Sequence, residues 1–335
     1  MDRWSRRQFM QGVGIAGLGL VAGCGRLPGP AREPAAQRVH RIGYLSTSAP
    51  DASPYFQAFQ QGLGELGYSD GHNITIEYRL GEGSAERLAE AAAELVRLPV
   101  DVIVSLATPA TQAASLVTST LPIVFINVND PVGLGIVASL ARPGGNVTGV
   151  STLSSTTGGK RLELLKEAVP GTSRVAVFWN AANPGQGLVF RAVEEAAQAL
   201  GLQLQSLELR GNDDLDSAFQ AALGEHADCL VVLPSIPVRY SAQIADFAAM
   251  NQLPAMYSER ARVESGGLMG YEPDYAALSR RAAYYVDRIL KGAKPADLPV
   301  EQPMTFDFII NLKTAQALGL TIPEPVLLQA TEVLQ

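Results

Sequence analysis

The stretch Thr108-Pro109-Ala110 follows an apolar run. Threonine commonly caps the start of a helix, and proline is favoured in the first helical turn. We therefore expect Thr108 to be an N-cap and Pro109 to be the first helical residue. The start of a helix presents backbone N–H groups and the positive end of the helix dipole, so this stretch could bind a carboxylate or a phosphate. An ordinary cap without a ligand fits the local sequence equally well.

Other polar residues that follow apolar runs could contact the same ligand. Asp130 could pair with an ammonium group, although a turn cap explains this residue at least as well. Asn183 is most simply a turn residue, and Glu259 is most simply a solvated charge. Ser235 and Tyr271 complete the candidates, with a hydroxyl group and an aromatic ring.

Patterns typical of enzymes are weak in this chain. Gly67-Tyr68-Ser69-Asp70-Gly71 matches the G-x-S-x-G nucleophile elbow, which must lead from a strand into a helix. Here a predicted helix comes first and a predicted strand follows, so a turn is the better explanation. The three histidines, His40, His72 and His226, form no metal-binding pattern. We therefore expect no enzyme, no metal and no cofactor.

The N-terminal segment has features of an export signal. The glycines of Gly12-Val13-Gly14-Ile15-Ala16-Gly17 have the spacing of a dinucleotide-binding turn, but basic residues rather than a strand precede them. Arg6 and Arg7 before a mildly apolar run resemble a twin-arginine signal. Val21-Ala22-Gly23-Cys24 resembles a lipobox, so residues 1–23 are the expected signal peptide and Cys24 the expected lipidation site. A protein without lipid, with a chance cysteine, is the alternative.

Composition describes the rest of the chain as folded and acidic. The chain is 47% apolar and 18% charged, with a net charge of −7 and a pI near 5.1. A nucleic-acid partner is not expected, because no run of Lys and Arg is present. Residues 24–39 are rich in Pro, Gly and Arg and are expected to form a tether. Cys229 lies in an apolar run, where a packing role is expected.

Strand-like and helix-like segments alternate in two rounds of the same order, which predicts two doubly wound α/β domains with parallel sheets. The Ser, Thr and Gly residues of 151–159 suggest a linker between the domains. Ligands of such sheets bind at the carboxyl ends of the strands, which predicts a cleft between the domains. The segments of the two rounds are 41–45, 56–66, 73–79, 84–98, 101–112, 121–131 and 146–151, then 174–185, 188–201, 202–211, 214–227, 228–238, 253–260 and 266–272.

From about Arg41 to Thr331 the chain resembles the ABC transporter substrate-binding proteins of the type I periplasmic-binding fold, in the branch of tryptophan and tyrosine binders. The segments that carry the resemblance include IGYL, GLGELGY, ATPATQAA, NDPVGLGIVASLARPGGNVTGVS, KRLELLKEAVP, YYVDRILKGAKPADLPVEQP and FDFIINLKTAQALGLTIP. It implies Rossmann-like lobes, a three-segment hinge and a ligand cleft between the lobes. The implied N-terminal lobe is 40–152 plus about 267–293, and the implied C-terminal lobe is 153–266 plus about 294–335.

The resemblance also implies a function. A monomeric, exported, lipid-anchored protein would capture an amino-acid-like or aromatic carboxylate by hinge closure and deliver it to an ABC permease with its ATPase. A sensory solute-binding lipoprotein is the alternative, and an exported hydrolase is a weaker one. The implied ligand-binding positions are Ser46 at the floor of the cleft, Thr108, Pro109 and Ala110 for an anion, Asp130 for an amine, and Asn183, Ser235 and Glu259 from the facing lobe.

Overall fold

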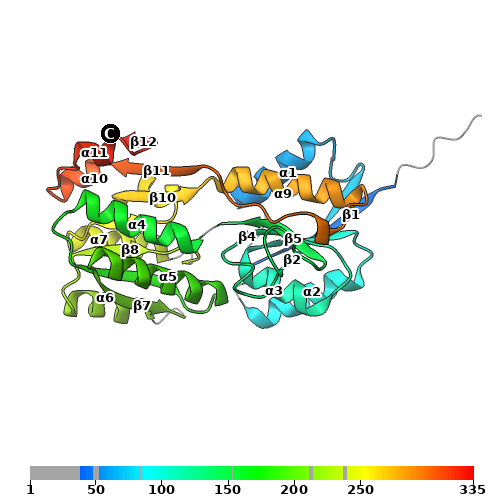
Figure 1. Ribbon diagram of the computed structural model, residues 1–335, viewed down its shortest axis with the longest axis horizontal. Coiled ribbons are helices and arrows are strands. Elements are labelled where there is room, and N and C mark those ends of the chain that lie inside the picture. The colour runs from blue at the N-terminus through cyan, green and yellow to red at the C-terminus, as the bar shows by residue number, and fades with distance from the viewer. Residues whose placement is uncertain (1–37, 48–52, 83, 153, 211–213, 237–239) are drawn as a thin grey trace, which may run out of the picture. The chain divides into compact units, whose positions relative to one another are not determined.

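The computed structural model describes residues 38–47, 53–82, 84–152, 154–210, 214–236 and 240–335 (Figure 1). The expected signal peptide, the lipidation site Cys24 and nearly all of the expected tether lie outside the described residues. Among the described residues, no helix has the length and apolar character needed to cross a bilayer. The same residues contain no group of three His, Cys, Asp or Glu side chains placed to hold a metal ion.

The first sheet has the strand order β2-β1-β3-β4-β5, and all of its neighbouring strands are parallel. Its strands are rich in apolar residues because helices cover both faces of the sheet. Helices α1 and α9 pack against each other on one face, and α2 and α3 cover the other. The elements are β1 (His40–Ser46), α1 (Pro54–Glu65), β2 (Ile74–Leu80), α2 (Ala85–Arg97), β3 (Val102–Leu106), α3 (Ala107–Val117), β4 (Ile123–Val128), β5 (Val147–Ser151) and α9 (Tyr275–Leu290).

The second sheet has the order β12-β11-β10-β9-β8-β6-β7. Its strands are parallel except for the antiparallel pair β10 and β11, where the chain re-enters the sheet from the opposite direction. Helices α4 and α5 pack on one face, and α6 and α7 on the other. The elements are α4 (Ser154–Ala168), β6 (Arg174–Asn180), α5 (Pro184–Leu200), β7 (Gln203–Leu209), α6 (Asp214–Gly224), β8 (Cys229–Val232), α7 (Ser241–Met250), β9 (Ala255–Tyr257), α8 (Arg260–Glu264), β10 (Met269–Pro273), η3 (Pro295–Asp297), β11 (Phe306–Asn311), α10 (Leu312–Ala317), α11 (Glu324–Leu327) and β12 (Glu332–Leu334).

Each sheet with its covering helices forms a lobe, and the chain passes between the lobes three times. The first passage separates β5 from α4, the second lies at Asp274, and the third covers residues 302–305. Backbone hydrogen bonds join these passages in pairs: Ser151 N–H donates to the carbonyl of Glu301, and Asp274 N–H donates to that of Thr305. The α/β fold with two wound lobes is therefore confirmed.

Two of the expected boundaries were wrong. The first return was expected to begin at about residue 267, but β10 is bonded into the second sheet, so the chain returns only at Asp274. The second return was expected at about 294, but η3 packs on β5 and Val300 N–H donates to the carbonyl of Leu140 in the first lobe. That return therefore follows Glu301, which pairs with Val150.

The expected linker at 151–159 is mostly helix. Helix α4 begins at Ser154, and Gly158 and Gly159 lie inside it. A Cβ atom on Gly158 would lie 2.5 Å from Cγ2 of Val193 on α5. These glycines therefore allow two helices to pack closely, which a composition-based prediction mistakes for flexibility.

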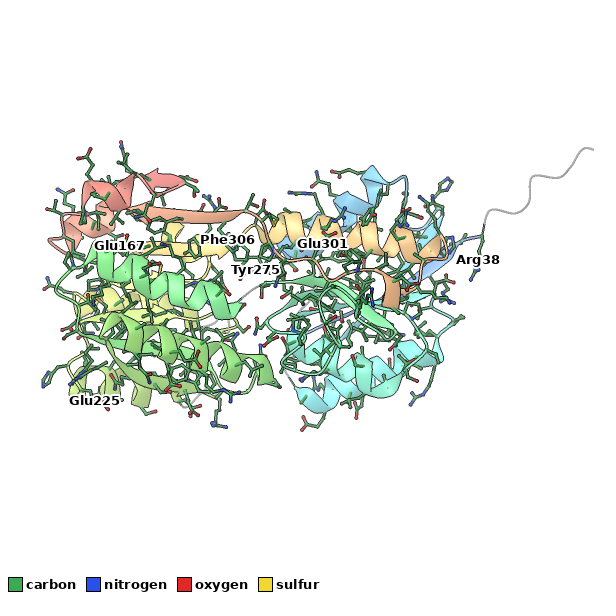
Figure 2. All side chains as sticks on the ribbon, viewed as in Figure 1. Arg38, Glu167, Glu225, Tyr275, Glu301 and Phe306 are labelled. Atoms are coloured by element: carbon green, nitrogen blue, oxygen red, sulfur yellow. The ribbon has the colours of Figure 1, made fainter. Side chains whose placement is uncertain are left out.

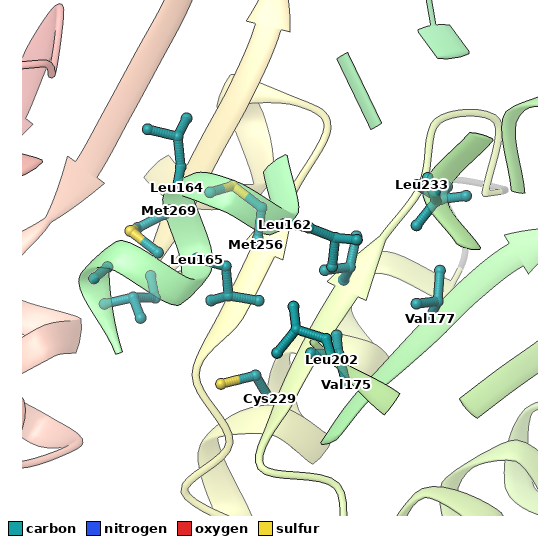
Figure 3. Packing of buried hydrophobic residues seen from close by; sticks show 14 of the residues in the cluster. Leu162, Leu164, Leu165, Val175, Val177, Leu202, Cys229, Leu233, Met256 and Met269 are labelled. Carbon is teal, nitrogen blue, oxygen red and sulfur yellow. The ribbon is translucent and has the colours of Figure 1, made fainter. Parts of the chain in front are cut away.

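The core of the second lobe includes Cys229 (Figure 3). This residue is fully buried and its sulfur lies 3.1 Å from Oγ1 of Thr172. Burial raises the pKa of the thiol to about 11. The thiol is therefore an unreactive packing group, and its expected role is confirmed.

Candidate functional site

The start of α3 differs from the expected cap. The N-cap is Leu106, with no side-chain cap bond, and α3 begins at Ala107, whose φ of 68° turns the chain out of β3. The prediction of Thr108 as N-cap was therefore wrong. Thr108 is buried and its Oγ1 accepts a 3.4 Å hydrogen bond from Asn129 N–H, which joins the ends of β3 and β4. Pro109 is half-buried and Ala110 fully buried, and the N–H groups of the first turn have no partners within the helix.

The end of β4 presents several polar groups. A bulge between Ile126 and Val128 gives Asn127 a φ of 61°, and its Oδ1 is buried without a hydrogen-bond partner among the described residues. Asn129 is buried, and its Oδ1 accepts a 2.9 Å bond from the hydroxyl of Ser154. Oδ1 of Asp130 accepts a 2.8 Å bond from Gly133 N–H, so Asp130 is a turn cap, the alternative that the sequence also allowed.

Ser46 lies at the carboxyl end of β1, on the same edge of the first sheet as Thr108 and Asn129. It is 1% exposed, and its backbone carbonyl accepts a hydrogen bond from Gly81 N–H. The floor position that the resemblance implies for Ser46 stays a prediction.

In the second lobe, Asn183 is the N-cap of α5 rather than only a turn residue. Its Oδ1 accepts a 3.1 Å bond from Gly185 N–H, and its Nδ2 donates a 3.2 Å bond to Oγ of Ser235. Nε2 of Gln186 also donates to this Oγ, at 3.4 Å. Gln186 is fully buried, and its Oε1 has no partner among the described residues.

Sequence reasoning missed Gln186. A glutamine at the third position of a helix is a known capping residue, so the available signal suggested a structural role.

Gly185 brings these two groups of residues together. A Cβ atom on Gly185 would lie 2.8 Å from Nδ2 of Asn129 and 3.0 Å from Oγ1 of Thr108. The first turn of α5 therefore contacts the carboxyl ends of β3 and β4. Polar groups of both lobes meet here. In the described part of the chain, Asn127 Oδ1 near the end of β4 and Gln186 Oε1 in the first turn of α5 are buried acceptors without a donor.

A second polar cluster lies at the carboxyl ends of β9 and β10. Oε2 of Glu259 accepts a 2.7 Å bond from Nε of Arg262, whose side chain is 4% exposed. Glu259 is therefore more than the solvated charge that the sequence allowed as an alternative, and its place in a ligand site stays a prediction. Burial raises the pKa of Glu272 to about 7, and the nearby carboxylates of Glu259 and Asp307 add to this shift.

Arg161 of α4 joins this cluster and is completely buried. Its Nε donates a 2.8 Å bond to the carbonyl of Tyr271, and its Nη1 donates a 3.4 Å bond to Oγ1 of Thr157. Its Nη2 has no partner, and Arg161 forms no ion pair with any described residue. This burial could not be predicted from the sequence, because an arginine in the amphipathic segment KRLELLKE suggests a solvated charge.

Aromatic rings lie at the same place. The rings of Tyr55 and Tyr275 meet edge to face with centroids 5.5 Å apart, at the starts of α1 and α9. The ring of Tyr271 stacks on Phe306 with centroids 5.5 Å apart. Figure 2 labels Tyr275 and Phe306, each at the first residue after a passage between the lobes.

Comparisons with known proteins agree with this fold. The family model for ABC transporter substrate binding proteins matches residues 46–334. The chain belongs to this family. It is 26% identical to the tyrosine-binding protein of Clostridioides difficile, over 92% of this chain and 90% of that protein.

Two solved structures share this fold closely. One is the ABC domain in complex with L-Trp from Streptococcus pneumonia, with a TM-score of 0.80 and 30% identity over 88% of this chain and all of that one. The other is a conserved domain protein from Vibrio cholerae, with a TM-score of 0.82 and 30% identity over the same shares. Members of the family are substrate-binding proteins that work with ABC permeases.

The G-x-S-x-G segment forms a turn between a helix and a strand. It lies between α1 and β2, with Gly67 at a φ of 85°. Oδ1 of Asp70 accepts bonds from the N–H groups of Gly71 and Ile76, and Ser69 N–H donates to Asn73. The predicted turn, with a helix before it and a strand after it, is therefore confirmed.

Proposed function

We propose that this protein captures a small carboxylate with an aromatic or amino-acid-like body between its two lobes and delivers it to an ABC permease. The observation that carries the proposal is the contact of Gly185 with Thr108 and Asn129, because it joins the strand ends of both lobes at one place. In wound α/β sheets, ligands bind outside the carboxyl ends of the strands. The L-Trp complex and the tyrosine-binding relative support the ligand class.

In this proposal the site is built from residues that the sequence suggested, but several of them position the site instead of contacting the ligand. Thr108 and Asn183 order the two strand-end regions, and Ser235 links Asn183 to Gln186. Asp130 keeps one carboxylate oxygen, Oδ2, for an ammonium group after capping the turn with the other. Ligand contacts that form only when both lobes meet shift the population towards the closed form.

A ligand screen tests the proposal. Thermal unfolding of the mature protein is measured with L-tryptophan, L-tyrosine, L-leucine, aromatic acids, sugars and nucleosides, and isothermal titration calorimetry follows for each solute that stabilises it. A solute present at 100 times its Kd adds about 2.7 kcal/mol of stability. We expect stabilisation by a carboxylate with an apolar body. Stabilisation by sugars or nucleosides alone would contradict the proposed class.

The location of the protein is a second part of the proposal. We place it outside the cytoplasm on a lipid anchor at Cys24, and Cys24→Ser should release it from the membrane fraction. Retention of that variant in the membrane fraction would contradict the anchor.

A further inference from the structure

We propose that Arg161 is the receptor for the ligand's carboxylate, an assignment that rests on the proposed function and makes it more specific. Buried charges in proteins are normally paired or bound to another charged group, because removing an ion from water costs several kcal/mol. Arg161 is 0% exposed, and among the described residues it forms no ion pair and its Nη2 donor has no hydrogen-bond partner. A carboxylate from a solute would supply the missing partner.

Arg161 shares this part of the structure with Arg262 and with the carboxyl groups of Glu259 and Glu272, which interact with Arg161 electrostatically without forming an ion pair with it. Two guanidinium groups, those of Arg161 and Arg262, are buried here, and each has one nitrogen that no described residue hydrogen-bonds. Glu259 is bound to Arg262 at 2.7 Å. Burial holds the pKa of Glu272 near 7, so this carboxyl is only partly charged at neutral pH. The Nη2 donor of Arg161, which has no hydrogen-bond partner among the described residues, would therefore favour a bound anion over a neutral or cationic group.

The position of Arg161 suits a ligand that closes the hinge. Its guanidinium contacts the carbonyl of Tyr271, three residues before the second passage at Asp274, while its helix begins directly after the first passage. Its own helix also contacts the strand-end site, because Ser154 donates to Asn129. An anion at Arg161 would thus lie where the two lobes are connected.

The neighbouring rings indicate the rest of the ligand. The pKa of Tyr275 is raised by burial and lowered by Arg161, so the tyrosine and the guanidinium are electrostatic neighbours. The half-buried ring of Tyr275 meets that of Tyr55 edge to face. Flat aromatic surface beside a cation suits a carboxylate with an aromatic body.

The test compares each acid with its amide. L-tryptophan and L-tryptophanamide share the ring and the amino group, but the acid has a carboxylate where the amide has a neutral carboxamide. L-tyrosine and its amide form a second pair. Calorimetry on the wild-type protein should show a preference for the acid of about 30-fold or more, as expected when a buried charge pair loses one partner. Equal binding of acid and amide would overturn the assignment and the carboxylate part of the proposed ligand class, while capture of an aromatic or amino-acid-like solute would stand.

Arginine variants then locate the carboxylate. Arg161→Gln should lose most of the preference by weakening the acid alone, whereas Arg191→Gln, an exposed change on α5, should keep it. If Arg161→Gln does not fold, Arg161→Lys keeps the charge without the planar fork and should weaken the acid by about tenfold. Equal weakening of acid and amide, or no weakening, would overturn the proposal. Failure of the wild-type protein to bind any acid would overturn both this proposal and the proposed function.

Discussion

The substitution Gly185→Ala should weaken ligand binding without weakening the fold. The added Cβ would lie 2.8 Å from Nδ2 of Asn129 and 3.0 Å from Oγ1 of Thr108, closer than side-chain carbons normally approach. Both of these atoms belong to the other lobe, so the clash arises only where the lobes meet. Relief requires the first turn of α5 to move away from the ends of β3 and β4, which opposes closure.

The expected size follows from known costs of overpacking. An inserted methyl group in a tight contact costs about 1–3 kcal/mol, which corresponds to a Kd increase of about 5- to 150-fold if the cost falls on the closed form. Replacing glycine by alanine also favours the helix by up to about 1 kcal/mol, but this gain applies to the open and closed forms alike. The unfolding temperature of the ligand-free variant should therefore not fall.

Gly187→Ala is the matched control, because a Cβ on Gly187 meets nothing within 4 Å in the same helix. Both variants are titrated by calorimetry with the solute that stabilises the wild-type protein best. We expect Gly187→Ala to bind like the wild type and Gly185→Ala to bind more weakly. The reasoning would be refuted if the two variants bound with the same affinity.

Three further variants test other parts of the structure. The pKa of Glu272 is raised from 4.5 to about 7 in the folded state, so the folded protein binds more protons between these values and its stability falls as pH rises through this window. Glu272→Gln removes that fall, so it should be more stable than the wild type by about 2–3 kcal/mol at pH 8, with little difference at pH 4. Urea unfolding of both proteins at both pH values tests this, and a stability difference between them that does not change with pH would contradict it. Asp130→Asn retains an oxygen that can cap Gly133 N–H, so it should weaken an amine-bearing solute by about tenfold or more in calorimetry while the unfolding temperature stays constant. Unchanged affinity would remove Asp130 from the site. Gly158→Ala should lower the free energy of unfolding by about 1–2 kcal/mol, because its Cβ would lie 2.5 Å from Cγ2 of Val193 and helix propensity offsets only part of that cost; a more stable variant in urea would contradict the close packing of α4 on α5.

Most of the fold could be predicted from the sequence because it depends on local patterns. Apolar runs such as Val102–Leu106 and the amphipathic period of Ala85–Arg97 specify strands and helices directly. The alternation of these elements then determines the wound topology. The predicted positions of the passages between the lobes were less accurate. Glycine is typical both of a flexible linker and of a close contact between helices, and only the contact of Gly158 with Val193 distinguishes the two.

The candidate site was harder to predict because its features arise from tertiary contacts. Thr108 has the sequence signature of a cap, yet its hydroxyl oxygen accepts a hydrogen bond from the N–H group of Asn129, which lies 21 residues away. Gln186 and Arg161 look like ordinary helical residues. Their buried and unpaired atoms become visible only when the elements around them are in place.

The three passages between the lobes also affect how the protein acquires its structure during synthesis. The core of the first lobe includes Leu278, Ala282 and Val286 of α9, which lie far beyond the whole first sheet in the chain. The N-terminal lobe therefore stays incomplete until more than four fifths of the protein has left the ribosome, and the usual order in which an N-terminal domain folds first does not apply. Between the synthesis of β5 and that of α9, α1 is the helix already made for that face of the first sheet, and the apolar surface that α9 later covers is available to chaperones.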